Sequence, residues 1–133
     1  MMDLIHSLIG IEHSGKVTYI SSHFDGQPNI TGKILRRYYT ERRKVEKLIA
    51  HGDITMLRPN IDGNFEKDSQ IENYKKLDRL ATPRAYRKDL NKIMKTITPK
   101  TISLKNYNSD LGGKHWAEWM YLYKDGKWTW QKV

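Results

Sequence analysis

The chain has 133 residues, of which 38% are hydrophobic, and this size suits a single domain, residues 1–133, with a real hydrophobic core. It contains no cysteine, which excludes disulfides, thiolate zinc sites and cysteine nucleophiles, and no apolar run approaches the ~18–20 residues of a membrane helix. The formal net charge of +9 favours an anionic partner, although a solvated basic surface explains the same charge equally well.

Near the N-terminus the sequence predicts a β-hairpin. Two runs with alternating apolar residues, Leu8–Glu12 and Lys16–His23, flank a glycine that supplies the positive φ of a tight turn. If Ser14-Gly15 forms a two-residue loop, Ile9 lies opposite Ile20 on a face that we expect to be buried.

A polar corner and two short helices are expected next. The corner His23–Gly26 ends the second strand, and apolar residues at helical spacing then predict one helix on either side of Tyr39-Thr40. Basic residues cluster at the joint between the helices: Arg36, Arg37, Arg42, Arg43 and Lys44. Such a cluster is usually a solvated face, and its alternative is an anion site.

The middle of the chain has weaker patterns. We expect a loop from Gly52 to about Ser69, a short helix over Ile71–Leu80, and an edge strand or extended connection over Thr96–Leu104. A second polar concentration at Thr82–Asp89 predicts a helix start where basic side chains face either an anion or the solvent. Asn106–Lys114 is expected to be a polar loop.

The C-terminal segment predicts a second hairpin. Asp125-Gly126 is a strong hairpin turn, and a two-residue loop pairs Tyr123 with Trp128 and Tyr121 with Trp130. The resulting aromatic face is either core or a surface that stacks a nucleobase. The expected fold is α+β: one antiparallel sheet built from the N-terminal and C-terminal hairpins, with several helices packed on one face.

Several of these landmarks occur together in a known group. The stretch Ile9–Leu35, with its corner His23–Gly26, resembles a widespread group of small proteins encoded mainly by phages and prophages. In that group a strand ends in His-aromatic-Asp-Gly-Tyr-Pro and a Gly-x-x-Leu helix follows; here Gln27-Pro28 stands in place of Tyr-Pro. The resemblance returns at Ala85–Asp89 and Tyr121–Trp128, and it implies the fold and a phage context.

That context implies a place and a role. The N-terminus lacks the basic residues of a signal peptide, so we expect the protein in the cytoplasm of the host cell, with no membrane partner. Small early phage proteins commonly counter host defence, and this analogy suggests an anti-defence role.

The residues leave the chemistry open. His23 as general base with Asp25 as its orienter or a metal ligand would suit an enzyme, but no nucleophile elbow, HExxH, phosphate loop or paired metal-ligand cluster completes a catalytic set. We therefore expect no metal and no cofactor. In the structural alternative, Asp25 accepts backbone N–H bonds in the turn and caps the next helix.

Three functions are compatible with the sequence. The first is sequestration of a nucleotide-derived immune signal without chemistry, with arginines on the phosphates and an aromatic ring on the base. A homo-oligomer could enclose such a ligand. The second is a basic inhibitor of the anti-CRISPR type that occludes a host defence protein or nucleic-acid complex, and the third is a phosphodiesterase. The candidate ligand-binding residues are His23, Asp25, Arg36, Arg84, Tyr86 and Arg87.

Overall fold

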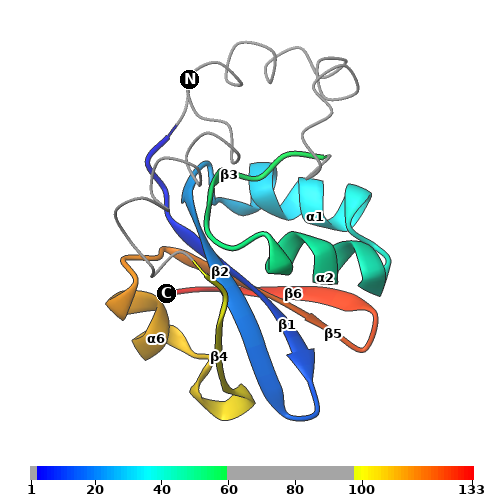
Figure 1. Ribbon diagram of the computed structural model, residues 1–133. Helices are drawn as coiled ribbons and strands as arrows, with labels where there is room; N and C mark the ends of the chain where they lie inside the picture. Colours follow the sequence, from blue (N-terminus) through cyan, green and yellow to red (C-terminus); the bar gives the residue numbers. More distant parts are fainter. Residues whose placement is uncertain (1–2, 60–97) are drawn as a thin grey trace.

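The N-terminal hairpin forms the centre of a six-stranded sheet (Figure 1). In the computed structural model, which describes residues 3–59 and 98–133, strands β1 (Ser7–His13) and β2 (Lys16–Phe24) pair antiparallel. Ser14 and Gly15 have φ angles of 49° and 79°, as a tight two-residue hairpin loop requires. Ile9 pairs with Ile20, which confirms the predicted register.

The C-terminal hairpin also has its predicted register. Strands β5 (Trp119–Lys124) and β6 (Lys127–Lys132) pair antiparallel across Asp125-Gly126, whose φ angles are 54° and 75°. Tyr123 pairs with Trp128, and Tyr121 with Trp130. The two hairpins lie side by side because β5 pairs with β1.

The sheet is mixed, whereas the sequence predicted an antiparallel one. The strand order is β3-β2-β1-β5-β6; β5 runs parallel to β1, and β3 (Ile54–Met56) runs parallel to β2. β4 (Lys100–Ser103) pairs antiparallel with the other end of β2. β3 lies in a stretch that was expected to be a loop. A parallel neighbour needs a crossover connection, and a pattern within one strand does not reveal its direction.

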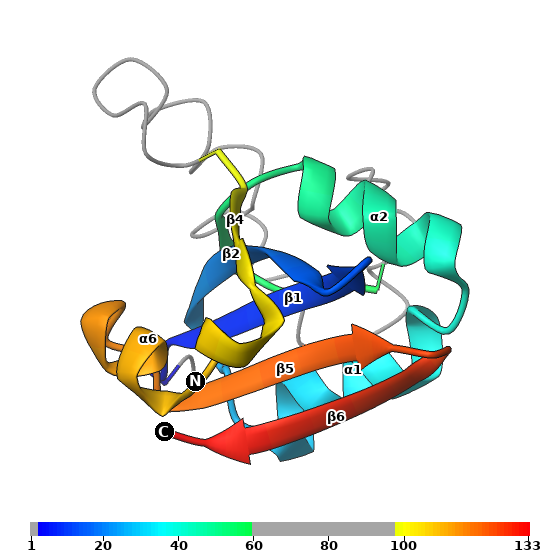
Figure 2. The same cartoon turned by 90° about the horizontal axis from the view of Figure 1, so that it is seen from below.

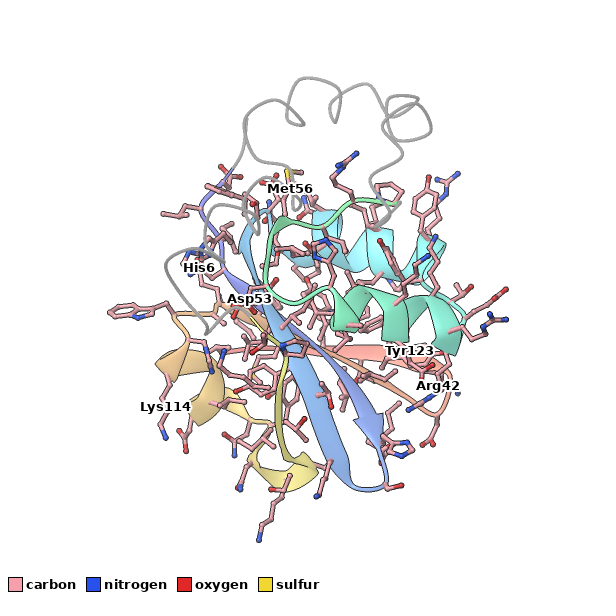
Figure 3. The ribbon with its side chains drawn as sticks, in the orientation of Figure 1. His6, Arg42, Asp53, Met56, Lys114 and Tyr123 are labelled. Carbon is pink, nitrogen blue, oxygen red and sulfur yellow. The ribbon has the colours of Figure 1, made fainter. Side chains whose placement is uncertain are left out.

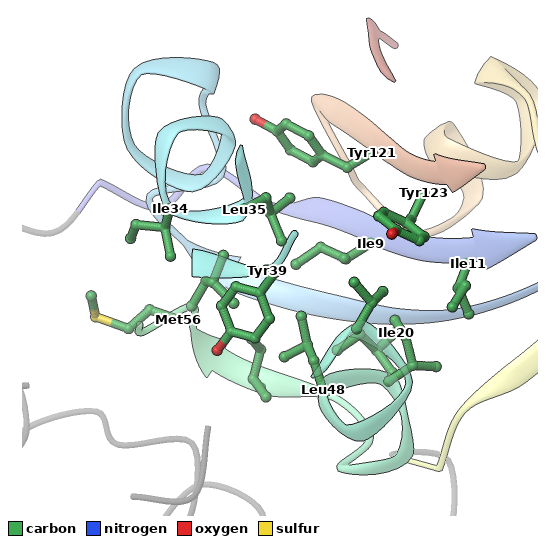
Figure 4. Close-up of a cluster of buried hydrophobic side chains, with 14 residues drawn as sticks. Ile9, Ile11, Ile20, Ile34, Leu35, Tyr39, Leu48, Met56, Tyr121 and Tyr123 are labelled. Atoms are coloured by element: carbon green, nitrogen blue, oxygen red, sulfur yellow. The ribbon is translucent and has the colours of Figure 1, made fainter. Parts of the chain in front are cut away.

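Two helices cover one face of this sheet. After a turn of π-helix at Pro28–Gly32, α1 (Lys33–Tyr38) and α2 (Arg42–Ala50) pack their apolar residues against the isoleucines of the N-terminal hairpin (Figure 4). The main cluster of buried side chains lies between the helices and the sheet: Ile9, Ile11, Ile20, Ile34, Leu35, Tyr39, Val45, Leu48, Ile49, Ile54, Met56, Leu57, Tyr121 and Tyr123.

A third helix packs on the opposite face, which differs from the expected arrangement with the helices on one face. α6 (Ser109–Lys114) lies where the sequence indicated a loop. The Asn108 side chain accepts hydrogen bonds from the N–H groups of Asp110 and Leu111, and this cap offsets the two glycines within the helix. A smaller core fills this side of the sheet: Leu8, Val17, Tyr19, Tyr107, Ala117 and Met120. The fold class is α+β, as predicted.

The aromatic face of the C-terminal hairpin is largely core. Tyr121 and Tyr123 are buried, and their hydroxyls donate to the carbonyls of Gly26 (2.7 Å) and Thr40 (2.9 Å). The Trp128 indole N–H donates to the Tyr39 carbonyl at 2.8 Å. Each of these aromatic residues thus packs its ring in the core and donates a hydrogen bond to a backbone carbonyl next to α1 or α2.

Gly10 allows two elements of the smaller core to approach closely. A Cβ at this position would lie 2.6 Å from Val17 Cγ1 and 3.1 Å from the Tyr107 ring. We expect Gly10→Ala to lower the free energy of unfolding by about 1–3 kcal/mol, because the core must shift to accept the methyl group. Gly113→Ala is the matched control: its Cβ meets nothing within 4 Å, and alanine in a helix should stabilise by up to ~1 kcal/mol. Urea unfolding measures both; equal stability of the two variants would contradict the prediction.

Candidate functional site

Asp25 is a structural residue of the polar corner. It is 5% exposed, its backbone has a φ of 55°, and its carboxylate accepts the N–H of Asp3 at 2.8 Å. Its own N–H donates to the Asp3 carbonyl at 2.8 Å, and its carbonyl accepts the Thr31 hydroxyl at 2.6 Å. Asp25 therefore ties the N-terminal segment and the π-helical turn to the end of β2. The sequence suggested a cap within the turn, but the partner of the carboxylate lies 22 residues away.

His23 faces the side of the sheet that carries α6. Side chains alternate along β2, so His23 lies on the same face as Tyr19, a member of the smaller core. Its ring stacks on His6, with ring centroids 4.8 Å apart. Burial, and after it the charge of His6, holds the pKa of His23 below its usual value. Both effects favour the uncharged form of the His23 imidazole.

Arg36 lies on the opposite face. It is exposed on α1, its Nε donates to the Gly32 carbonyl at 3.1 Å, and its guanidinium carbon lies 4.9 Å from the centroid of the Trp130 ring. Because the sheet separates His23 from Arg36, the structure does not bring these two candidate residues together. Three further candidates, Arg84, Tyr86 and Arg87, lie outside the described residues.

A groove between α2 and the N-terminal hairpin is a better candidate for a ligand. It has a volume of about 330 Å³, at the lower end of the ~300–1,000 Å³ of small-molecule sites. Four apolar residues and four polar ones line it: Ile11, Ile49, Ala50 and Pro99, with His13, Thr18, Arg42 and Glu46. The lining comes from β1, β2, α2 and the residue before β4. Figure 3 shows Arg42 and His6 at opposite sides of the molecule, so this groove is remote from the histidine pair.

Arg42 is the charged group that the fold holds most firmly at the groove. Its Nη2 donates to the Glu12 carbonyl at 2.6 Å, and its Nε lies 3.5 Å from a carboxylate oxygen of Glu46. A guanidinium has five N–H donors, and these contacts with described residues engage only Nε and Nη2. Nη1 can therefore donate to an anion while the other contacts keep the side chain in place.

Two of the polar side chains that line the groove already have partners. The Thr18 hydroxyl lies 3.1 Å from that of Thr101, within hydrogen-bond distance, and the Glu46 carboxylate faces Arg42. Of the described residues that line the groove, His13 and Glu46 carry side chains that can transfer a proton, and Glu46 is paired with Arg42. Among residues 3–59 and 98–133, no group of three or more His, Asp or Glu side chains could hold a metal ion.

The sequence marked only part of this groove. Arg42 belongs to the basic cluster noted between the helices, but His13, Thr18 and Pro99 carried no signal of their own. Pro99 reaches the groove because β4 returns to the edge of β2, a pairing across more than 80 residues of sequence that no local pattern encodes.

Comparison with known proteins adds no relative: no protein-family model, curated protein or solved structure matches this chain. Within the part of the chain that the structure describes, no helix is long and apolar enough to span a bilayer.

If Asp25 is structural, its substitution should lower stability. Asp25→Ala leaves the Asp3 N–H without its acceptor and places alanine in the left-handed region, so we expect a loss of about 1–3 kcal/mol in the free energy of unfolding. Asp25→Asn is the control, since asparagine tolerates this conformation and its amide oxygen still accepts. Urea unfolding compares the two; an alanine variant as stable as the wild type would refute the structural role.

Stability should fall in mild acid. Burial lowers the pKa of His23, and burial followed by the charge of Lys100 lowers the pKa of His115, so both bind protons more weakly when folded than in the unfolded chain. The unfolded state then takes up more protons as the pH drops below about 6.5, and the free energy of unfolding decreases. We expect lower stability at pH 5.5 than at pH 7.5, and a smaller difference in a His23→Gln/His115→Gln double variant. An unchanged difference would contradict this assignment.

Proposed function

We propose that this protein binds a small nucleotide-derived anion in the groove beside α2 and sequesters it without chemistry. The observation that carries the proposal is the combination of apolar walls with a guanidinium held at the rim. Arg42 is fixed by the Glu12 carbonyl on one side and by Glu46 on the other. Such a preorganised cation lowers the cost of ordering the site when an anion binds.

The chemistry of a nucleotide matches this lining. A purine or pyrimidine ring can pack on Ile11, Ile49 and Pro99, while a phosphate accepts from Arg42. His13 can add a ring N–H donor. The volume of about 330 Å³ favours a mononucleotide or a compact cyclic nucleotide over a longer polymer.

The biological role follows from the sequence resemblance. If the chain is encoded by a phage, as the corner motif suggests, a protein that holds a nucleotide signal without consuming it would lower the free concentration of that signal in the host. We therefore propose an anti-defence role, in which a host immune signal is the ligand.

A thermal-shift screen of cyclic and adenine-based nucleotides tests the proposal. We expect one class to raise Tm in a saturable way, because a ligand that binds only the folded state stabilises it. Arg42→Gln should weaken binding about 10–100-fold, the cost of losing a hydrogen bond to a charged group. Arg43→Gln is the matched control, with the same charge change on the same helix at a residue that does not line the groove.

The fate of the ligand separates the functions. A sequestering protein should release the nucleotide unchanged after heating, whereas a converted product that depends on His23 would indicate a phosphodiesterase. If the shift is lost in Arg36→Gln, Arg84→Gln or Arg87→Gln and kept in Arg42→Gln, the ligand lies at one of the sites suggested by the sequence, and the groove is rejected.

A basic inhibitor of a defence complex is the second candidate, and the charge of the helical layer favours it. Between Lys33 and Ala50 there are seven Lys and Arg residues against two Glu. If this face binds a nucleic-acid complex, affinity for DNA or RNA should fall steeply as salt rises from 50 to about 200 mM. Binding to arbitrary DNA with this salt dependence, and no shift with any nucleotide, would favour the inhibitor.

A further inference from the structure

β6 is an open edge of the sheet. It is the last strand in the order β3-β2-β1-β5-β6, and no other strand of the described residues pairs with its outer side. Figure 2 shows β6 running along the margin of the molecule, with β5 on one side only. Most of its residues are exposed.

The hairpin register defines which groups face outward. In a two-residue hairpin the residues that flank the loop exchange hydrogen bonds with each other, so Lys127, Thr129 and Gln131 turn their backbone groups toward β5. The N–H of Val133 donates to the Glu118 carbonyl at 2.9 Å, which agrees with this alternation. Trp128, Trp130 and Lys132 therefore present three N–H and three C=O groups at the free edge.

This edge has few of the usual devices that block pairing. Edge strands are commonly short, interrupted by proline, bulged, or protected by charged side chains, especially lysine. β6 has six residues in continuous register with β5, and it contains neither proline nor a bulge. Its ends carry two exposed lysines, Lys127 and Lys132, which are compatible with a strand of opposite charge.

The charges around the edge specify that strand. The guanidinium of Arg36 lies over the Trp130 ring, 4.9 Å from its centroid, on the face that α1 covers. The side chain opposite Trp130 on an added strand would have its Cβ about 4.5–5.5 Å from that of Trp130 and so within reach of Arg36. A carboxylate there would pair with the guanidinium. A second copy would instead bring two chains of net charge +9 together, edge to edge.

We propose that β6 binds an extended acidic segment of a partner protein by strand addition, with carboxylates on the α1 side contacting Arg36 and Lys132. Main-chain hydrogen bonds to the outward groups of Trp128, Trp130 and Lys132 provide affinity, and the charges provide specificity. This surface is separate from the groove beside α2, to which β6 contributes no lining residue.

Hydrogen exchange on the full chain tests the proposal with a synthetic peptide, acetyl-Thr-Glu-Thr-Glu-Thr-Glu-Thr-amide. At millimolar peptide we expect the exchange rates of the Trp128, Trp130 and Lys132 N–H groups to fall by up to about tenfold. The exchange rates of the Thr129 and Gln131 N–H groups should be unchanged. Two peptides are controls: one with Lys in place of Glu, and one with N-methylated Glu in place of Glu, which keeps the charge and removes the N–H groups that would face β6. Both should fail to slow exchange, because the first has the wrong charge and the second lacks the N–H groups of a strand.

A matched pair of variants separates the backbone contribution from the side chain. Trp130→Pro and Trp130→Ala both remove the indole, but only proline removes the outward N–H, which β5 does not use. We expect Trp130→Ala to retain measurable peptide affinity, Trp130→Pro to lose it, and Arg36→Gln to weaken it about tenfold.

Three results would overturn the proposal. The first is no slowing of exchange at these three N–H groups in the wild-type chain, a measurement that needs no variant to fold. The second is equal binding of the acidic peptide and either control peptide. The third is protection of these N–H groups in the free protein that grows with protein concentration, which would identify the edge as an interface between copies of the chain.

Discussion

Among the described residues, three hydrogen bonds from aromatic side chains connect the C-terminal hairpin to the polar corner and to the joint between α1 and α2. Tyr121, Tyr123 and Trp128 donate to the carbonyls of Gly26, Thr40 and Tyr39, at distances between 2.7 and 2.9 Å. These carbonyls belong to the polar corner and to the joint between α1 and α2, where the helical ladder leaves acceptors unpaired. The C-terminal hairpin thus provides hydrogen-bond donors for three backbone carbonyls of the N-terminal half. These hydrogen bonds help to position α1 and α2 on the sheet.

The pairing of β1 with β5 makes this connection possible. β1 is the central strand, and side chains on both of its faces are fully buried, as Leu8 and Ile9 show. A two-sided core divides the candidate ligand-binding residues between faces: His23 lies on the side of α6, and Arg36 on the side of α1. Residues that are close in sequence are therefore separated by the sheet, and the surfaces available to ligands form elsewhere.

The two surfaces that we propose have different physical origins. The groove beside α2 forms where a helix, a hairpin and β4 meet without filling the space between them, and it offers apolar contact with a fixed cation. The β6 edge exists because the sheet ends there, and it offers unpaired backbone groups with basic side chains around them. The net charge of +9 favours acidic occupants at both, but only the local geometry distinguishes a small anion from an extended strand.

Local patterns in the sequence were sufficient for both hairpins, including their register. Turn geometry at Ser14-Gly15 and Asp125-Gly126 and the period of two along each strand depend only on neighbouring residues. The two helices on the first face followed from their apolar spacing in the same way. Asp25 was recognised as a residue of the turn, although its carboxylate binds a distant N–H.

Contacts between distant parts of the chain decided the rest. The direction of β5 beside β1, the pairing of β3 and β4 with β2, and the position of α6 on the second face are properties of how the connections run. The groove needed Pro99 to return to the edge of β2, and the separation of His23 from Arg36 needed a sheet between them. Sequence determines which side of a strand a residue faces relative to its neighbours, but only tertiary packing determines what lies on that side, because burial is a property of the assembled chain.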